Sequence, residues 1–215
     1  MDMIAERIRS GGLVIGLLLV LGGAPAVAGT VIDEWNSIPS PEAPKLAAPA
    51  VTARTTAFLV LDIEQRTCNA ERRPRCLDTV PSIAAFLTKA RAAGMMVAHS
   101  TTNAGTPDTI LPRAKPLTGE PVVKASVDKF LGTDLERVLR ERGIETVIVC
   151  GTAAQGAVMH TATGAAQRKF KIVLPVDCLS AEDLFTEKAV VWSLIKGPAT
   201  GSVTTLTTLD AIAVK

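Results

Sequence analysis

The stretch "VCGTAAQGAVMHTA", residues 149–162, decides the fold because it is the turn from a buried strand into a helix. The apolar run before it, "ETVIVCG" (145–151), shows no polar alternation, which is typical of a central parallel strand. A helix is predicted to follow from about Gln155 to Lys169. No Cys or Ser lies at the turn itself, so the residues usually activated for nucleophilic attack are missing there.

The same pattern of strand and helix extends through most of the chain. Further strands are predicted at 56–62, 95–100, 120–125 and 171–177, with a last edge strand within 203–214. Helices are predicted at 80–93, from the N-cap Thr133 to Gly143, and across 181–195. This alternation predicts an α/β, three-layer Rossmann-like fold, with a mainly parallel sheet and helices on both faces.

Three residues fall at or near the carboxyl ends of the predicted strands, where open parallel sheets bind their ligands. They are Asp62, Lys124 and Gly151. Taken alone, Asp62 is better explained as a cap on a nearby loop, and Lys124 as a solvated strand end. Their shared position is nevertheless the first indication of a functional site.

Composition limits the classes of function. The 215 residues suit one medium domain with a full core. Aromatic residues make up 3% of the chain and Tyr is absent, which argues against stacking platforms for nucleic acid. The formal charge of +2 is too small for electrostatic binding to nucleic acid or an acidic membrane. We therefore expect a small-molecule substrate, copies of the same chain, or both as partners.

Residues 1–28 are predicted to be a signal peptide. Two arginines precede the apolar run 11–23, and Ala26 and Ala28 provide the small residues that signal peptidase reads. The run is shorter than the roughly 20 residues needed to span a bilayer, so an uncleaved anchor is the alternative and no stable span is expected after cleavage. Residues 29–53 are then a Pro/Ala-rich arm and 54–215 the folded domain. The protein is expected to be exported, either periplasmic or secreted.

Export permits disulfides between the four cysteines. Cys68 and Cys76 enclose a short polar segment with turn character, so a bridge between them is predicted. Cys150 and Cys178 each end an apolar run and are expected to be buried thiols.

Three segments in this order resemble the isochorismatase-like hydrolase family. They are "FLVLDIEQ" (58–65), "VVKASVDKFLGTDLERVLRERGIETVIVCG" (122–151) and "GTAAQGAVMHTA" (151–162). This cysteine-hydrolase family includes isochorismatases, nicotinamidases and N-carbamoyl amidases. The resemblance covers about residues 55–183 and implies a hydrolase acting on a small molecule.

The resemblance implies a catalytic triad of Asp, Lys and Cys, of which two members match by position. Asp62 matches the Asp after the first strand, and Lys124 matches the Lys six residues before Phe130. Ala157 occupies the place of the nucleophilic Cys, which closes the thioester route. Some isochorismatases also carry a small residue there, because their vinyl ether chemistry needs a proton donor and a water. Asp62 would then act as acid or base, with Lys124 as its electrostatic partner.

Other candidate site residues follow from the same comparison. The turn after the strand and the residues around the cleft are expected to contact substrate: Ala154, Gln155, Gly156, Phe130 and His99. The Cys68–Cys76 loop should overhang the cleft, where its arginines could pair with an anionic substrate or simply be solvated: Arg72, Arg73 and Arg75. His160 is expected to be packed or partner-facing. No metal and no cofactor are expected, because the two histidines lack ligand spacing.

Two hypotheses remain at this stage. One is an exported hydrolase that uses Asp62 and Lys124 on a small, anionic molecule without a Cys nucleophile. The other is a catalytically inactive protein that keeps the fold for binding or assembly, and Ala157 favours it. The family resemblance and the long arm also predict a homo-oligomer.

Overall fold

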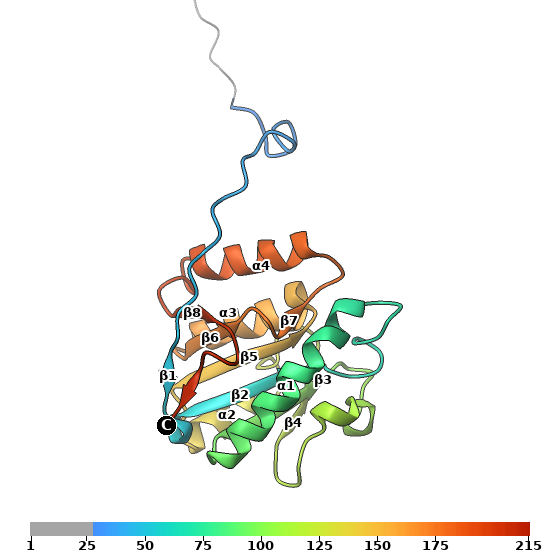
Figure 1. The fold of residues 1–215 in the computed structure, drawn as a ribbon, viewed down its shortest axis with the longest axis vertical. Helices are drawn as coiled ribbons and strands as arrows, with labels where there is room; N and C mark the ends of the chain where they lie inside the picture. The colour runs from blue at the N-terminus through green and yellow to red at the C-terminus, as the bar shows by residue number, and fades with distance from the viewer. Residues whose placement is uncertain (1–27) are drawn as a thin grey trace, which may run out of the picture. The chain divides into compact units, whose positions relative to one another are not determined.

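The computed structural model describes residues 28–215. Residues 1–27, which hold nearly all of the predicted signal peptide, lie outside the described residues. The chain divides into two compact units, Met1–Ala43 and Pro44–Lys215. In the described part of the first unit, Thr30 and Asp33 hydrogen bond to each other within a short turn. The second unit contains the sheet and the helices (Figure 1).

The main sheet is built from parallel strands in the order β4-β3-β2-β5-β6-β8. β7 pairs with the carboxyl end of β5, and all of these pairs are parallel. The bounds are β2 (Thr56–Leu61), β3 (Met96–Thr101), β4 (Val122–Lys124), β5 (Thr146–Thr152), β6 (Lys171–Pro175), β7 (Leu179–Ser180) and β8 (Thr204–Thr207). The predicted fold class is therefore confirmed.

The strand order reverses between β2 and β5. The chain runs outward from β2 through β3 to β4, returns to β5 on the other side of β2, and continues to β6 and β8. In such sheets the loops that follow the two central strands diverge and leave a crevice at their carboxyl ends. Asp62 follows β2, and the turn after Thr152 follows β5, so both lie at this point.

Four helices cover the two faces of the sheet (Figure 1). α1 (Pro74–Ala92) packs Ile83, Phe86 and Leu87 against Phe58 and Val60 on one face. The opposite face of β2 carries alternate residues such as Leu59, which belong to the core formed with the other three helices. These helices are α2 (Leu135–Glu141), α3 (Met159–Gln167) and α4 (Leu184–Lys196).

α1 begins earlier than predicted. Pro74 occupies its first turn, where a proline costs no hydrogen bond, and Pro81 is accommodated inside the helix. The helix predicted from Gln155 starts as a π-helical turn, Ala154–Val158, before α3. Both differences lie at helix beginnings, which sequence patterns define least well.

The part of the predicted arm that belongs to the second unit is tied to the C-terminal region. The Ala47 amide donates to the Leu206 carbonyl of edge strand β8, and the Thr207 hydroxyl donates to the Ala47 carbonyl. β1 (Ala50–Val51) pairs with β9 (Ala213–Val214) in a separate two-stranded sheet. These contacts partly cover an edge strand, which limits pairing with other chains.

Two disulfides fasten the second unit. Cys68 is bonded to Cys76, as predicted. The prediction of thiols at Cys150 and Cys178 is wrong, because these two residues form a second disulfide. β7 returns to pair with β5 directly after Cys178, and this brings the two Cα atoms to 5.2 Å. Within residues 28–215, no helix has the length and apolarity that crossing a membrane requires.

Candidate active site

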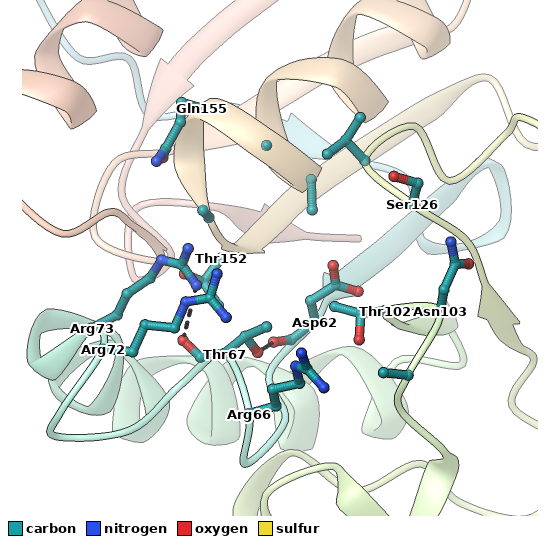
Figure 2. A pocket seen from close by; sticks show the side chains of 15 residues that line it. Asp62, Arg66, Thr67, Arg72, Arg73, Thr102, Asn103, Ser126, Thr152 and Gln155 are labelled. Atoms are coloured by element: carbon teal, nitrogen blue, oxygen red, sulfur yellow. Dashed lines mark hydrogen bonds between the residues drawn. The ribbon is translucent and has the colours of Figure 1, made fainter.

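A cavity of about 440 Å³ opens at the carboxyl ends of β2 and β5. Asp62 lies at its base, between the turn that follows β5 and the loop that precedes α1 (Figure 2). Thr102 and Asn103 after β3 and Ser126 after β4 complete the wall. The cavity therefore occupies the crevice that the strand order predicts.

Asp62 is held rigidly in an unusual backbone conformation. Its φ of 53° lies in the left-handed region, which Asp tolerates better than most residues. The Thr67 hydroxyl donates to its carbonyl, and the Ser100 hydroxyl donates to its Oδ1 atom at 2.7 Å. Only 4% of the residue is exposed, so the carboxyl group is fixed before any ligand arrives.

The ammonium group beside Asp62 belongs to Lys129. Its Nζ atom donates to Asp62 Oδ2 at 2.8 Å and to the carbonyls of Ala125 and Ser126. Lys124, the predicted partner, is an exposed residue at the end of β4 and does not contact Asp62. It lies on the same side of the strand as Val122, because side chains alternate along a strand. The loop after β4 then folds back and buries Lys129 completely.

The pKa of the Asp62 carboxyl is raised above its ordinary value. Burial is the main cause, and the nearby carboxylate of Glu64 adds to it. The Lys129 ammonium and the Ser100 hydroxyl act in the opposite direction because they stabilise the charged form. Burial and partners thus oppose each other at this carboxyl, an arrangement common among residues that transfer protons.

The turn after β5 forms the second wall. Gln155, Gly156 and Ala157 line the cavity, whereas Ala154 is fully buried in the core behind it. Gly151 has a φ of 141°, and a Cβ atom there would lie 2.1 Å from the Leu61 carbonyl oxygen. The glycine therefore allows β5 to approach β2 at the base of the cavity.

No thiol is available at this site. The sequence contains four cysteines, and all four are in the two disulfides. Cys150 directly precedes the turn but is fully buried and bonded to Cys178. In this structure no cysteine lines the cavity, and the four sulfur atoms are bonded to one another in pairs.

The three predicted arginines have different positions. Arg72 and Arg73 line the cavity, whereas Arg75 lies outside it and pairs with Glu187 of α4 at 2.7 Å. Arg73 is buried and pairs with Glu182 at 2.8 Å, so its charge is largely compensated. Within residues 28–215, no carboxylate forms an ion pair with Arg72 or with Arg66, a further arginine of the cavity wall.

Sequence and structure comparisons agree on the family. The model of the isochorismatase domain matches residues 56–208. The chain belongs to the isochorismatase family. A relative in Escherichia coli O157:H7, the isochorismatase family protein YecD, is 30% identical over 155 residues, which span 61% of this chain and 82% of the relative.

Solved structures give the same result for this isochorismatase-family chain. An isochorismatase family protein from Desulfovibrio vulgaris is 26% identical with a TM-score of 0.67, and the match covers 74% of this chain and 96% of the other. N-carbamoylsarcosine amidase from Thermoplasma acidophilum is 22% identical with a TM-score of 0.63, covering 73% and 97%. The second likeness shows the fold alone.

Besides Lys124, Ala154 and Arg75, two more predicted site residues of this family member lie outside the cavity. Phe130 is buried in the core, where its ring stacks on Phe170 with a centroid separation of 6.0 Å. His99 is a buried residue of β3, with its Nε2 atom 3.0 Å from Glu120 Oε2. Burial lowers the pKa of His99, although Glu120 opposes this shift.

Sequence reasoning missed Lys129, Arg66, Ser100 and Thr67 in this family member. Lys129 is part of the segment that carries the family resemblance, five residues after Lys124. Its role depends on how the loop after β4 folds back, and no local sequence pattern predicts the path of that loop. Ser100 could have been found, because the end of a strand adjacent to β2 must lie beside Asp62.

Proposed function

We propose that this isochorismatase-family protein is a hydrolase that uses Asp62 as its acid–base group, paired with Lys129, and needs no cysteine nucleophile. The observation that carries this proposal is the buried ion pair between the two residues at the base of the cavity. A buried ion pair is costly to keep, and its Asp62 member lines a cavity large enough for a small molecule. Both family membership and the hydrolase class of the relatives support it.

The pair supplies what vinyl ether hydrolysis requires. Protonated Asp62 gives its proton to the vinyl carbon, and water adds to the oxocarbenium carbon that forms. The water then returns one proton to Asp62, and the hemiketal separates into an alcohol and a carbonyl compound. Lys129 stabilises the Asp62 carboxylate between these steps, and general acid–base transfer of this kind contributes about 10²–10⁴ in rate.

The substrate is proposed to be a small anion. Arg66 and Arg72 bring two guanidinium groups to the cavity wall, and Figure 2 shows both side chains on the side of the loop that precedes α1. Guanidinium groups bind carboxylates with paired hydrogen bonds. In this proposal the anion binds to the two guanidinium groups, and the reacting group of the substrate extends to Asp62.

The protein is also proposed to be exported and to form a homo-oligomer. Two disulfides support an oxidising compartment, in agreement with the signal peptide expected at the N-terminus. Leu184 and Phe185 at the start of α4 are 64% and 68% exposed, which supports burial against another copy. Analytical ultracentrifugation of the mature protein tests assembly, and a monomer at micromolar concentration would contradict it.

A second candidate function is binding or assembly without catalysis. The absence of any free thiol and the presence of Ala157 at the turn favour it. A panel of vinyl ethers, amides and carbamoyl compounds, tested on the wild type and on Ala157→Cys, separates the two functions. Hydrolysis by the wild type supports the enzyme. Hydrolysis by Ala157→Cys alone supports the inactive fold.

A further inference from the structure

Ser100 contacts Asp62 through both its side chain and its backbone. It belongs to β3, next to β2, and only 1% of it is exposed. Its hydroxyl donates to Asp62 Oδ1 at 2.7 Å. The Asp62 amide in turn lies 3.2 Å from both the Ser100 hydroxyl and the Ser100 carbonyl. Ser100 does not line the cavity, so these contacts are its means of affecting the site.

These contacts complete the fixation of the carboxyl group. The Lys129 ammonium, in the loop after β4, donates to Oδ2. The Ser100 hydroxyl, near the end of β3, donates to Oδ1. The carboxyl is thus held at both oxygens, while Thr67 holds the backbone carbonyl of the same residue. A carboxyl fixed in this way cannot rotate without breaking hydrogen bonds in a buried environment.

We propose that Ser100 is a positioning residue that sets the orientation and the proton affinity of Asp62. This inference rests on the proposed function, because it assigns Ser100 its role through the acid–base group. A hydrogen bond donated to a carboxylate stabilises the charged form, so removing the donor favours the protonated form. The Ser100 hydroxyl therefore makes the Asp62 carboxyl release its proton more readily than it would without this donor.

The two charged groups closest to Asp62 in its electrostatics, Lys129 and Glu64, are held by contacts that do not involve Ser100. Lys129 is anchored by two backbone carbonyls. Glu64 is held by the hydroxyls of Thr102 and Thr109. Three arginines also face the cavity: Arg66, Arg72 and Arg73. A shift seen on removing the hydroxyl can therefore be assigned to that hydroxyl.

The test is a titration of the Asp62 side-chain carboxyl by carbon NMR on the folded protein, which needs no substrate. Asp62→Asn identifies the signal. Ser100→Ala is expected to raise the titration midpoint by about one pH unit, the size of one hydrogen bond to a charged group. An unchanged midpoint would overturn the inference.

Ser180→Ala is the matched control. Ser180 is also fully buried, and its hydroxyl has no hydrogen-bond partner within residues 28–215, so the Asp62 midpoint should not move. An equal shift in this variant would overturn the assignment to Ser100. If Ser100→Ala does not fold, Ser100→Cys keeps the volume and replaces the hydroxyl with a weak donor, and the same upward shift is expected.

Kinetics separate failure of this inference from failure of the proposed function. Ser100→Ala should lower kcat, leave KM near the wild-type value and move the alkaline limb of the pH profile upward, because the proposed first step needs protonated Asp62. If Asp62→Asn abolishes hydrolysis while Ser100→Ala matches the wild type in midpoint and kcat, the inference about Ser100 fails. If Asp62→Asn hydrolyses substrate at the wild-type rate, the proposed function fails, whatever the titration shows.

Discussion

At the scale of single residues, the site depends on one buried ion pair. The ammonium of Lys129 is fully buried, and it lies 2.8 Å from a carboxyl group that is itself almost buried. Removing one member of such a pair leaves the other charged and unpaired in the protein interior, which costs more than the pair contributes. This distinguishes Lys129 from Lys124, which is exposed at a strand end.

Replacing Lys129 with Met should therefore destabilise the protein by about 3–5 kcal/mol at neutral pH, because Asp62 loses its counter-charge. The matched control Lys124→Met should leave stability nearly unchanged. Denaturant unfolding of the two variants and the wild type measures both effects. Equal stability of the two variants would contradict the assignment of Lys129 as the partner.

Arg72→Gln should raise KM for an anionic substrate by about three- to tenfold, with little change in kcat. The figure is modest because the arginine is exposed and its charge is screened by solvent. Arg75→Gln is the control, since that side chain pairs with Glu187 outside the cavity. Steady-state kinetics at constant ionic strength give both values, and a similar KM rise in the two variants would argue against a specific anion site.

At the scale of elements, the site depends on the approach of β5 to β2 and on two disulfides. Gly151 lets the two strands meet without a side chain between them. The Cys68–Cys76 bridge fastens the loop that carries Arg72 and Arg73 to the first turn of α1. Gly151 thus fixes the wall formed by the turn after β5, and the Cys68–Cys76 disulfide fixes the wall formed by the loop before α1.

Gly151→Ala should destabilise the protein by about 3 kcal/mol or more, because the added Cβ meets a backbone oxygen and the positive φ disfavours alanine. Gly156→Ala serves as the comparison, because the added Cβ would lie 3.6 Å from its nearest neighbour, Val127 Cγ1, which is an ordinary contact distance. Thermal unfolding of both variants makes the comparison. Similar melting temperatures would show that the strands can separate at little cost.

Replacing both cysteines of a pair with alanine should lower the free energy of unfolding. The expected loss is about 2.5 kcal/mol for Cys68–Cys76 and about 3.5 kcal/mol for Cys150–Cys178. The second loss is larger because that disulfide closes a longer loop in the unfolded chain. Denaturant unfolding under oxidising conditions measures the two losses. Adding a reductant should lower the stability of the wild type toward that of the variants. A wild type that is insensitive to complete reduction would contradict this account.

At the scale of the whole molecule, the sequence predicted the fold better than the site. Strand and helix alternation is a repeated signal, and small errors at helix beginnings do not change the topology. The site depends on loops, and there the prediction of Lys124 failed because loop 125–130 folds back to bring in Lys129. The disulfide at Cys150 was missed for a similar reason, since only β7 brings Cys178 to it.

Stability should also fall on mild acidification, partly through His99. Burial lowers the pKa of His99 in the folded protein, so its contribution to stability is present above its unfolded pKa of about 6.5. That contribution is lost as pH falls, because the unfolded chain then binds a proton that the folded chain resists. Asp62, with a raised pKa, works in the opposite direction: its folded form takes up a proton more readily, which favours the folded state as pH falls.

The variant His99→Gln isolates the histidine, since its amide can still donate to Glu120. Between pH 7 and pH 5, the variant should lose less unfolding free energy than the wild type does. Parallel slopes for the two proteins would indicate that another group controls this range.

The central claim is that Asp62 performs the acid–base chemistry of a hydrolase without a thiol. The most direct measurement is kcat/KM of Asp62→Asn relative to the wild type, on whichever panel substrate the wild type hydrolyses. Asn keeps the shape and accepts the left-handed backbone conformation, whereas the proton transfer and the charge that pairs with Lys129 are both removed. The account predicts a fall of about 10²–10⁴ in kcat/KM with the fold intact. A value equal to that of the wild type would contradict it.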